Sequence, residues 1–410
     1  MSIIVSKFGG SSIADANQFR QVRRILASRS VRRYIVLSAP GKRDPHDDKI
    51  TDLLCSANAL YASGQDGSAP LQEVRNRFTA IARELSLNVD IEALLANLES
   101  DMRHSADRAA SRGEYLCARM FSAYADIPFV DATELIRFDE NGRIQPDEIR
   151  RRVRAMADRL YCAVIPGFYG VLPNGEIKTF SRGGSDITGA LVAAALEADV
   201  YENWTDVDGL MSIDPASCPD AVCHAAVSYR QMQLLARAGA QVLHPYCLEP
   251  VCEAGIPTML RNTFAPEQPG TYISDHVRTY VPCVCIRRGF QAVEIADLGD
   301  EASSIVDGLP VQRYHSGDGR EMIVLQSTKD IHGHPANIVS AFGLSSARRT
   351  EAMQCVDPIA VQHLDHVSEF VVSPEQSVKA MCILHELILS GTVKASRTHS
   401  GSCAPCHLPQ

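Results

Sequence analysis

The chain opens with an apolar strand that runs into a lysine, a pair of glycines and two hydroxyl residues. Ile3–Lys7 is the strand, Phe8-Gly9-Gly10-Ser11-Ser12 follows it, residues 13–27 have helical spacing, and Tyr34–Ser38 is a second apolar strand. A strand, a helix and a second strand in this order predict a parallel sheet, because parallel strands need a crossover connection. This opening restricts the chain to an α/β fold.

The same segment has the composition of an anion site. Gly9 and Gly10 allow the backbone to approach an anion closely, and Lys7 supplies a positive charge. Ser11 and Ser12 are predicted to cap the helix that follows. The lysine precedes the glycines, so the segment is not a Walker A loop. A strand, a Gly-Gly turn and a capped helix also occur in proteins that bind no anion. Other segments must therefore decide whether this one is an anion site or only a structural turn.

Length and charge narrow the class of protein. The 410 residues exceed the usual size of one domain, so two domains are expected. A net charge of -9 argues against nucleic acid or an anionic membrane as the main partner. The sequence has neither an apolar run of membrane-spanning length nor the pattern of a signal peptide, so we expect a cytoplasmic protein.

Most of the 13 cysteines are scattered singly, as expected of small buried side chains in a reducing compartment. The exception is Cys403-Ala404-Pro405-Cys406-His407, whose spacing matches a c-type haem attachment site or half of a zinc site. Haem attachment needs export, and zinc needs further ligands. We therefore interpret residues 392–410 as a flexible tail.

Alternating strands and helices continue to about residue 274. Residues 71–125 are predicted to be mainly helical, 146–160 and 186–197 to be helices, and 162–168 and 200–205 to be strands. Short β-rich pieces with helices between them follow from 283 to 391. The pattern predicts a smaller α+β domain after a boundary near residues 272–282.

A second glycine-rich loop, Thr179–Asp186, repeats the logic of the first. Gly183 and Gly184 open an apolar helix, Ser185 can cap it or bind an oxygen, and Arg182 can pair with a carboxylate or phosphate. Asp186 would repel an anion unless it holds a lysine or a metal, and both roles serve phosphoryl transfer. The alternative is a capping carboxylate.

An acidic segment follows the predicted strand at 200–205. Thr205, Asp206, Asp208 and Asp214 lie at the end of that strand and in the next turn, where they could bind ribose, Mg²⁺ or a base, or merely form an acidic turn. Together the three segments place two anion-binding loops and an acidic edge at strand ends of one sheet. Open α/β sheets bind ligands there.

In this order, the segments resemble the aspartate kinase family: Lys7-Phe8-Gly9-Gly10-Ser11-Ser12, Ser181–Asp186, Thr205–Gly209 through Asp214-Pro215, and Leu243-His244-Pro245. Gly113-Glu114-Tyr115-Leu116 and Val36–Ala39 also fit. The resemblance implies a three-layer amino-acid-kinase sandwich with a mainly parallel sheet over residues 1–275. It also implies a smaller α+β domain, similar to ACT regulatory domains, over 283–391.

The resemblance further implies ATP-dependent phosphorylation of the β-carboxylate of L-aspartate, the first step towards lysine, threonine and methionine, with ATP and Mg²⁺ as cofactors. Catalytic roles fall to Lys7 and Asp186, and substrate-binding roles to Ser38, Thr51, Glu114 and Arg182. No residue is assigned as a metal ligand. The implied ATP-binding residues are Lys7, Phe8, Gly9, Gly10, Gly183, Gly184, Ser185, Thr205, Asp206, Asp208, Asp214 and Gln241.

Two departures from the family pattern shape the prediction. Gln241 stands where the family often has a lysine that reaches the ATP phosphates, so slower turnover or weaker ATP binding is expected. Residues 283–391 lack a clear glycine-rich effector turn, for which Ser340–Leu344 is a poor substitute. We therefore expect this domain to respond weakly to lysine or threonine, while still forming a homodimer.

Two alternative functions stay open. One is a kinase of the same fold with another acidic amino acid as substrate, which Arg182 and Glu114 argue against because their charges suit an α-amino acid. The other is a catalytically weak relative that binds nucleotide or amino acid as a regulatory subunit. Gln241 and the diverged second domain favour that alternative, and Lys7, Arg182 and Asp186 oppose it.

Overall fold

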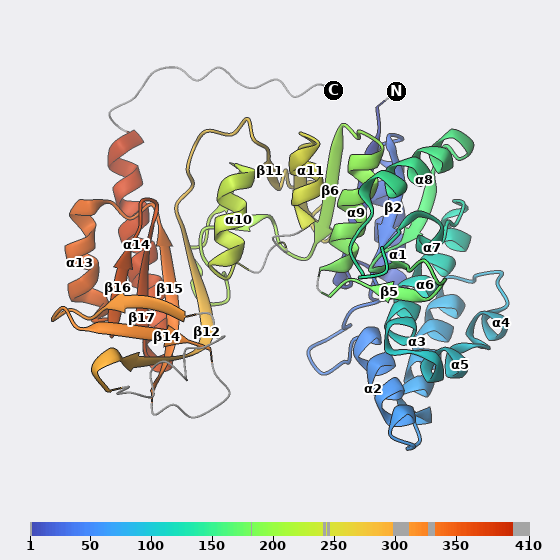
Figure 1. Ribbon diagram of the computed structural model, residues 1–410. Helices are drawn as coiled ribbons and strands as arrows, with labels where there is room; N and C mark the ends of the chain where they lie inside the picture. The colour runs from blue at the N-terminus through green and yellow to red at the C-terminus, as the bar shows by residue number, and fades with distance from the viewer. Residues whose placement is uncertain are drawn as a thin grey trace. The chain divides into compact units, whose positions relative to one another are not determined.

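The computed structural model describes residues 2–181, 183–240, 243, 247–297, 311–326 and 333–396 (Figure 1). The chain divides into two compact units. Unit 1 comprises Met1–Leu210, Cys223–Ala236 and Gln241–Arg278, and unit 2 comprises Met211–Val222, Arg237–Ala240 and Thr279–Gln410. Unit 2 thus includes two short segments from the earlier part of the chain, which no sequence pattern indicated. The domain limits 1–275, 283–391 and 392–410 stay a prediction.

Unit 1 is built on a seven-stranded sheet with the order β3-β2-β1-β6-β10-β11-β9. Every pairing along it is parallel except that of β10 with β11. The mainly parallel sheet predicted from the opening segment is therefore confirmed. The strands are β1 (Ile4–Phe8), β2 (Arg32–Leu37), β3 (Ala163–Pro166), β6 (Val200–Thr205), β9 (Ala226–Val227), β10 (Thr258–Asn262) and β11 (Thr271–Ile273).

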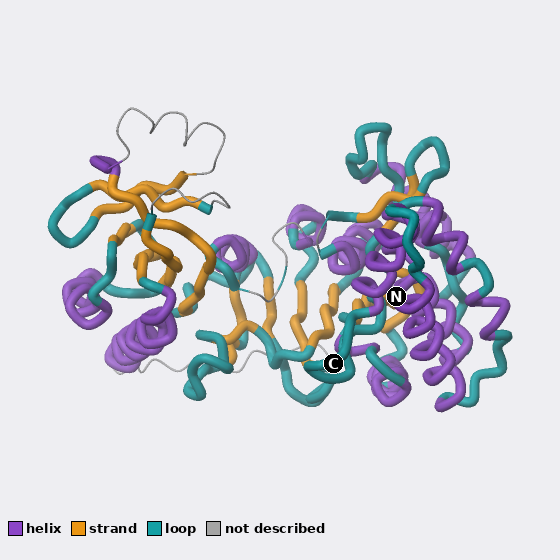
Figure 2. Tube along the Cα trace, turned by 90° about the horizontal axis from the view of Figure 1, so that it is seen from below, coloured by secondary structure: helices purple, strands orange, loops and turns teal. Residues whose placement is uncertain are grey.

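Helices lie on both sides of this sheet (Figure 2). On one side, α1 (Ala16–Ala27), α2 (Ile50–Ala62), α3 (Ser68–Glu84), α5 (Leu98–His104) and α6 (Ala106–Ala125) share a hydrophobic core with the strands. On the other side, α9 (Gly184–Ala195) packs on β1, β2 and β6. The result is a three-layer sandwich, as predicted.

The remaining elements of this part of the chain are short or lie around the sandwich. Helices α2 to α5 gather at one end of unit 1 (lower right in Figure 1). The other elements are η1 (Ser11–Ile13), α4 (Ile91–Leu95), α7 (Ala132–Leu135), α8 (Pro146–Arg159), β4 (Tyr169–Val171), β5 (Ile177–Thr179), β7 (Leu210–Met211), β8 (Cys223–His224), α10 (Tyr229–Arg237) and α11 (Glu249–Glu253).

The first helix starts later than the sequence predicted. Ser11 and Ser12 form a short 3-10 turn, and α1 begins only at Ala16. Asp15 is its N-cap, accepting the backbone N–H groups of Asn17 and Gln18. The predicted serine cap is therefore wrong, because an aspartate four residues further on has the extended backbone that an N-cap needs.

Unit 2 contains a ring of six strands that closes in the order β12-β14-β13-β16-β17-β15, with antiparallel pairing throughout. Helices α13 (Ser346–Val356) and α14 (Ser377–Ser396) pack on it through a shared apolar core. A separate, smaller α+β part is thereby confirmed. Its strands are β12 (Cys283–Glu294), β13 (Val311–His315), β14 (Glu321–Leu325), β15 (His334–Phe342), β16 (Ala360–His363) and β17 (Val367–Val372), and its 3-10 turns are η3 (Ile295–Asp297) and η5 (Pro374–Gln376).

The turn from β15 into α13 contains Gly343, which has a positive φ of 88°. It is the single glycine of the Ser340–Leu344 segment, so the turn is not glycine-rich, as the sequence analysis noted. Over the described ranges, no helix is long and apolar enough to cross a lipid bilayer.

Candidate active site

A lysine and an aspartate meet where β1 and β6 run side by side. Lys7, the fourth residue of β1, pairs in register with Asn203 of β6. Its Nζ lies 2.5 Å from the Asp186 Oδ1 in the first turn of α9. The lysine side chain is only 9% exposed, so this ion pair is shielded from solvent. The predicted catalytic residues are thus brought together from two segments far apart in the sequence.

Asn203 completes this cluster and was not found by sequence reasoning. Its Nδ2 donates to the same Asp186 oxygen at 2.8 Å, and the residue is buried. The Tyr201 hydroxyl donates to the Asp186 backbone carbonyl at 3.0 Å. The carboxylate is therefore held from two directions while it holds Lys7. The sequence signal that could have found Asn203 is the alternation of side chains along the strand, which places residues 201 and 203 on one face of the sheet.

The Gly9-Gly10 turn is a close crossing of two backbones. The Gly10 carbonyl accepts the Gly41 N–H at 2.9 Å, and a Cβ on Gly41 would come within 2.7 Å of the Gly10 carbonyl carbon. The Gly9 N–H donates to the Trp204 carbonyl at 3.0 Å. It is therefore not one of the donors that an anion could use here, contrary to the role predicted for it.

The second glycine loop lies at the N-terminus of α9. Gly183 has a positive φ of 60° and is the N-cap, without a side-chain cap. A Cβ on Gly184 would come within 2.5 Å of the Phe168 ring, so only glycine fits. Ser185 is buried, and Asp186 bonds to Lys7 rather than capping the helix. The capping alternative for Asp186 is therefore wrong.

Glu114 is a buried carboxylate on α6 beside the segment that follows β2. Its side chain accepts the backbone N–H of Ala39, while its Oε2 is buried and has no hydrogen-bond partner among the described residues. Burial raises its pKa to about 8, and Arg112 and Lys7 act in the opposite direction. Gly113 permits this approach, because a Cβ there would come within 2.7 Å of the Ala39 Cβ. Glu114 is thus a buried acid with only part of its hydrogen-bonding capacity used in the described part of the chain.

The family follows from comparison with known proteins. The amino acid kinase family matches residues 2–262. Aspartokinase 3 of Bacillus subtilis is 32% identical over 392 residues, covering 88% of this chain and 84% of that protein. The chain belongs to the amino acid kinase family, among the aspartokinases. The family resemblance inferred from the motifs is therefore confirmed.

Solved structures agree with this membership. The aspartate kinase of Clostridium acetobutylicum has 31% identity and a TM-score of 0.80, covering 94% of this chain and all of that one. Escherichia coli aspartokinase III, solved with aspartate and ADP, has a TM-score of 0.76 at 22% identity, covering 95% of this chain and 100% of that one, and supports the fold alone.

The acidic segment of this aspartokinase is held by its own neighbours. Asp208 accepts the Asn262 Nδ2 at 2.7 Å, and Asp206 accepts the Thr205 hydroxyl at 3.1 Å. Asp214 belongs to unit 2, where its carboxylate accepts the backbone N–H of Ala216 and the hydroxyl of Ser217. Thr205 is the last residue of β6, Asp206 and Asp208 follow it within unit 1, and Asp214 organises a turn within unit 2.

The other predicted residues are two on the substrate side, one buried aromatic ring, and several that the structure does not describe. Ser38 continues the pairing of β2 with β1 and donates its N–H to the Phe8 carbonyl at 3.2 Å. Thr51 is partly buried in the first turn of α2. The Phe8 ring is fully buried and stacks on Trp204 with centroids 5.8 Å apart, so it cannot face a nucleotide. Arg182 and Gln241, and His244 and Pro245 of the third motif, lie outside the described residues.

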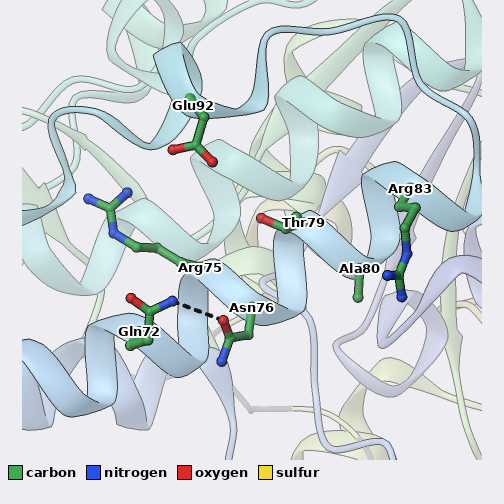
Figure 3. A pocket seen from close by; sticks show the side chains of 7 residues that line it. All are labelled: Gln72, Arg75, Asn76, Thr79, Ala80, Arg83 and Glu92. Atoms are coloured by element: carbon green, nitrogen blue, oxygen red, sulfur yellow. Dashed lines mark hydrogen bonds between the residues drawn. The ribbon is translucent and has the colours of Figure 1, made fainter.

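A cavity of about 510 Å³ lies away from these residues, on α3 and α4 (Figure 3). None of its lining residues is a predicted site residue, and Gln72 donates to Asn76 at 2.9 Å within it. In the described ranges no group of three His, Cys, Asp or Glu side chains is arranged to hold a metal ion. The candidate active site is therefore described from Lys7, Asp186, Asn203 and Glu114.

Proposed function

We propose that this chain transfers the γ-phosphoryl group of ATP to the β-carboxylate of L-aspartate, giving 4-phospho-L-aspartate. The observation that carries the proposal is the shielded pair of Lys7 on β1 with Asp186 in the first turn of α9, in a chain that belongs to the aspartokinases. Relatives along most of its length are named aspartokinases. ATP is the proposed phosphoryl donor.

The chemistry needs positioning more than proton transfer. The attacking β-carboxylate is already ionised at neutral pH, so no general base is required. A carboxylate and a triphosphate repel each other, and the protein must offset that repulsion where they meet. Lys7 would do so at the transferring phosphoryl group. Asp186, restrained by Asn203, would keep the lysine in a single orientation.

Glu114 would receive the ammonium group of aspartate. Its buried Oε2 has no hydrogen-bond partner among the residues that the structure describes, and a cation is the ligand that such an oxygen favours. An ammonium would also lower the raised pKa of Glu114, so substrate binding and ionisation of this acid are coupled. Arg182 would pair with the α-carboxylate, and Ser38 and Thr51 would lie beside the substrate.

The nucleotide would lie over the two glycine loops and the acidic edge. The proposed contacts are Gly10, Gly183, Gly184 and Ser185 for the phosphates, Thr205, Asp206 and Asp208 for the nucleoside, and Gln241 in place of the usual lysine. Mg²⁺, when bound, would neutralise phosphate charge. It would be held mainly by the phosphates and water, because this ion rarely uses an all-protein cage and Asp186 is already paired with Lys7.

Unit 2 is proposed to be a diverged regulatory domain that forms a homodimer and responds weakly to lysine or threonine. Its strand-to-helix turn has one glycine, Gly343, where an effector turn would be rich in them. We also propose a cytoplasmic enzyme without nucleic-acid or membrane partners. The net charge of -9 supports this.

The test is an aspartyl hydroxamate assay with ATP and Mg²⁺, run in parallel with aspartate, glutamate and acetylglutamate. Turnover with aspartate alone is expected. Turnover with another acid instead would assign a different substrate, and turnover with none would favour a binding subunit. Repeating the aspartate reaction with millimolar lysine or threonine tests the regulation separately, since strong inhibition would contradict a degenerate effector domain.

A further inference from the structure

Strand β6 presents two different environments on its two faces. Tyr201 and Asn203 point towards the Asp186 cluster, whereas Glu202 and Trp204, which alternate with them, point the other way. On that second face is a cavity of about 590 Å³ whose lining includes Arg24, Arg29, Arg32 and Arg261 together with Trp204. We call it the arginine cavity. It is separated from the candidate active site by the sheet.

Arg32 of this cavity is paired with a buried carboxylate behind it. Glu202 accepts two hydrogen bonds from Arg32, at 2.7 and 2.9 Å, and both side chains are 2% exposed. Glu202 also accepts the Ser6 hydroxyl and the Trp204 indole N–H, each at 2.9 Å. This one carboxylate faces two arginines, Arg32 and Arg261.

Arg261 is therefore a surplus positive charge. Its nearest approach to Glu202 is 3.9 Å, and its side chain is only 14% exposed. One terminal nitrogen donates to the backbone carbonyls of Pro266 and Gln268, but its buried Nε has no partner in the described ranges. Burial lowers the pKa of Arg261; Glu202 acts in the opposite direction, and Arg32 and Arg29 add to the lowering. The protein thus buries more positive than negative charge here.

Two further guanidinium groups are open to solvent at the same cavity. Arg24 and Arg29 are exposed, and within the described part of the chain their side chains have no hydrogen-bond or ion-pair partner. Two features of the arginine cavity disfavour the binding of an anion. Glu267 also lines the cavity, and the negative end of the α1 dipole lies at Ile25 and Ser28. Arg32 already satisfies that helix end, donating to the Ile25 carbonyl at 2.7 Å.

We propose that the arginine cavity is a binding site for a small phosphate-bearing molecule, distinct from the ATP and aspartate site. Guanidinium groups bind phosphate through paired, charge-assisted hydrogen bonds. The two open arginines, Arg24 and Arg29, supply such donors, and the mostly buried Arg261 adds positive charge to the lining. The volume lies in the range of about 300–1,000 Å³ that is usual for small-molecule sites and exceeds the needs of a bare phosphate ion. A phosphomonoester fits this description better than inorganic phosphate.

Ligand binding in the arginine cavity can be followed by the fluorescence of Trp204, which lines it. Trp204 is the only tryptophan, and its ring lies between Arg32 and Arg261, at 5.2 and 4.8 Å from the guanidinium carbons. Tryptophan fluorescence is titrated with inorganic phosphate and, separately, with glycerol 3-phosphate, against sodium chloride at equal ionic strength. We expect a saturable change with both phosphates, tighter for the ester, and none with chloride.

Variants assign the response to the cavity. The double variant Arg24→Gln/Arg29→Gln, at exposed positions, should weaken phosphate binding by about tenfold or more. The matched control is Arg75→Gln/Arg83→Gln, which removes two arginines from the other cavity (Figure 3) and should leave binding unchanged. Lys7→Ala should also preserve the response, because Lys7 lies on the opposite face of the sheet.

Three results would overturn the proposal. They are a non-saturable change that chloride reproduces, equal losses in the two arginine pairs, and loss of the response in Lys7→Ala, which would place the ion at the candidate active site. Because none of these measurements uses turnover, the proposal and the kinase activity can fail independently. Circular dichroism of each variant checks that the fold is retained.

Discussion

The two faces of strands β1 and β6 carry ionic clusters that are built differently. On one face, Lys7, Asp186 and Asn203 balance one cation against one anion, and the pair retains some exposure. On the other face, Arg32 and Glu202 are almost completely buried and fully hydrogen-bonded, with Arg261 as an additional cation. The first faces the candidate active site, whereas the buried Arg32–Glu202 pair of the second holds the sheet to α1 beside the arginine cavity. The same strands therefore separate chemistry from stability.

The sharpest way to test this division is Lys7→Ala. Removing the cation that would face the transferring phosphoryl group should lower kcat by about a thousandfold or more while leaving the protein folded. Steady-state hydroxamate kinetics and circular dichroism measure the two effects. Substantial retained activity would remove Lys7 from the proposed mechanism.

The opposite face is tested by Glu202→Gln. This change leaves the buried Arg32 and Arg261 without their carboxylate and should lower the free energy of unfolding by about 3–5 kcal/mol. Denaturant unfolding measures it. The control Glu197→Gln breaks a surface pair with Arg154, in which Glu197 is 77% exposed, and should cost less than about 1 kcal/mol. If Glu202→Gln instead abolished turnover in folded protein, the two faces would not be separate.

The variant Asn203→Ala tests whether the hydrogen bond from Asn203 to Asp186 contributes to turnover. Without the 2.8 Å hydrogen bond, the carboxylate and Lys7 gain freedom, so kcat should fall by about tenfold to a hundredfold with little change in KM for aspartate. Ser6→Ala is the matched control, since it removes a hydrogen bond to Glu202, the residue next to Asn203, on the opposite face of the sheet. A variant that lost stability but kept kcat would make Asn203 merely structural.

The last prediction concerns pH. The pKa of Glu114 is raised from 4.5 to about 8, so the folded protein binds this proton more tightly than the unfolded chain. Its contribution to stability is full below about pH 4.5 and is lost as the pH rises towards 8, with a slope of at most about 1.4 kcal/mol per pH unit.

Glu114→Gln should remove that component from the stability profile, measured by denaturant unfolding at several pH values. Glu99→Gln, at an exposed pair with Arg103, provides the control and should leave the profile unchanged. Identical profiles for wild type and Glu114→Gln would show that the carboxyl is not held neutral. Ammonium binding would then need another explanation.

Much of the site was predictable because its signals are local. The glycines beside Lys7 and before Asp186, and the strands that lead into them, are readable from a few neighbouring residues. Their order along the chain was enough for the family. The helix cap was missed because Ser11, Ser12 and Asp15 are all good N-cap residues, and only the backbone conformation selects Asp15.

The sequence alone determined an α/β sandwich, its family and the residue types that face a phosphoryl group. Only the tertiary structure decided which of them meet. Asn203 reaches Asp186, Glu202 reaches Ser6 at a separation of 196 residues, and four arginines line one cavity. The reason is physical: these contacts depend on strand register and on which face a side chain takes, and a shift of one residue would exchange the two faces.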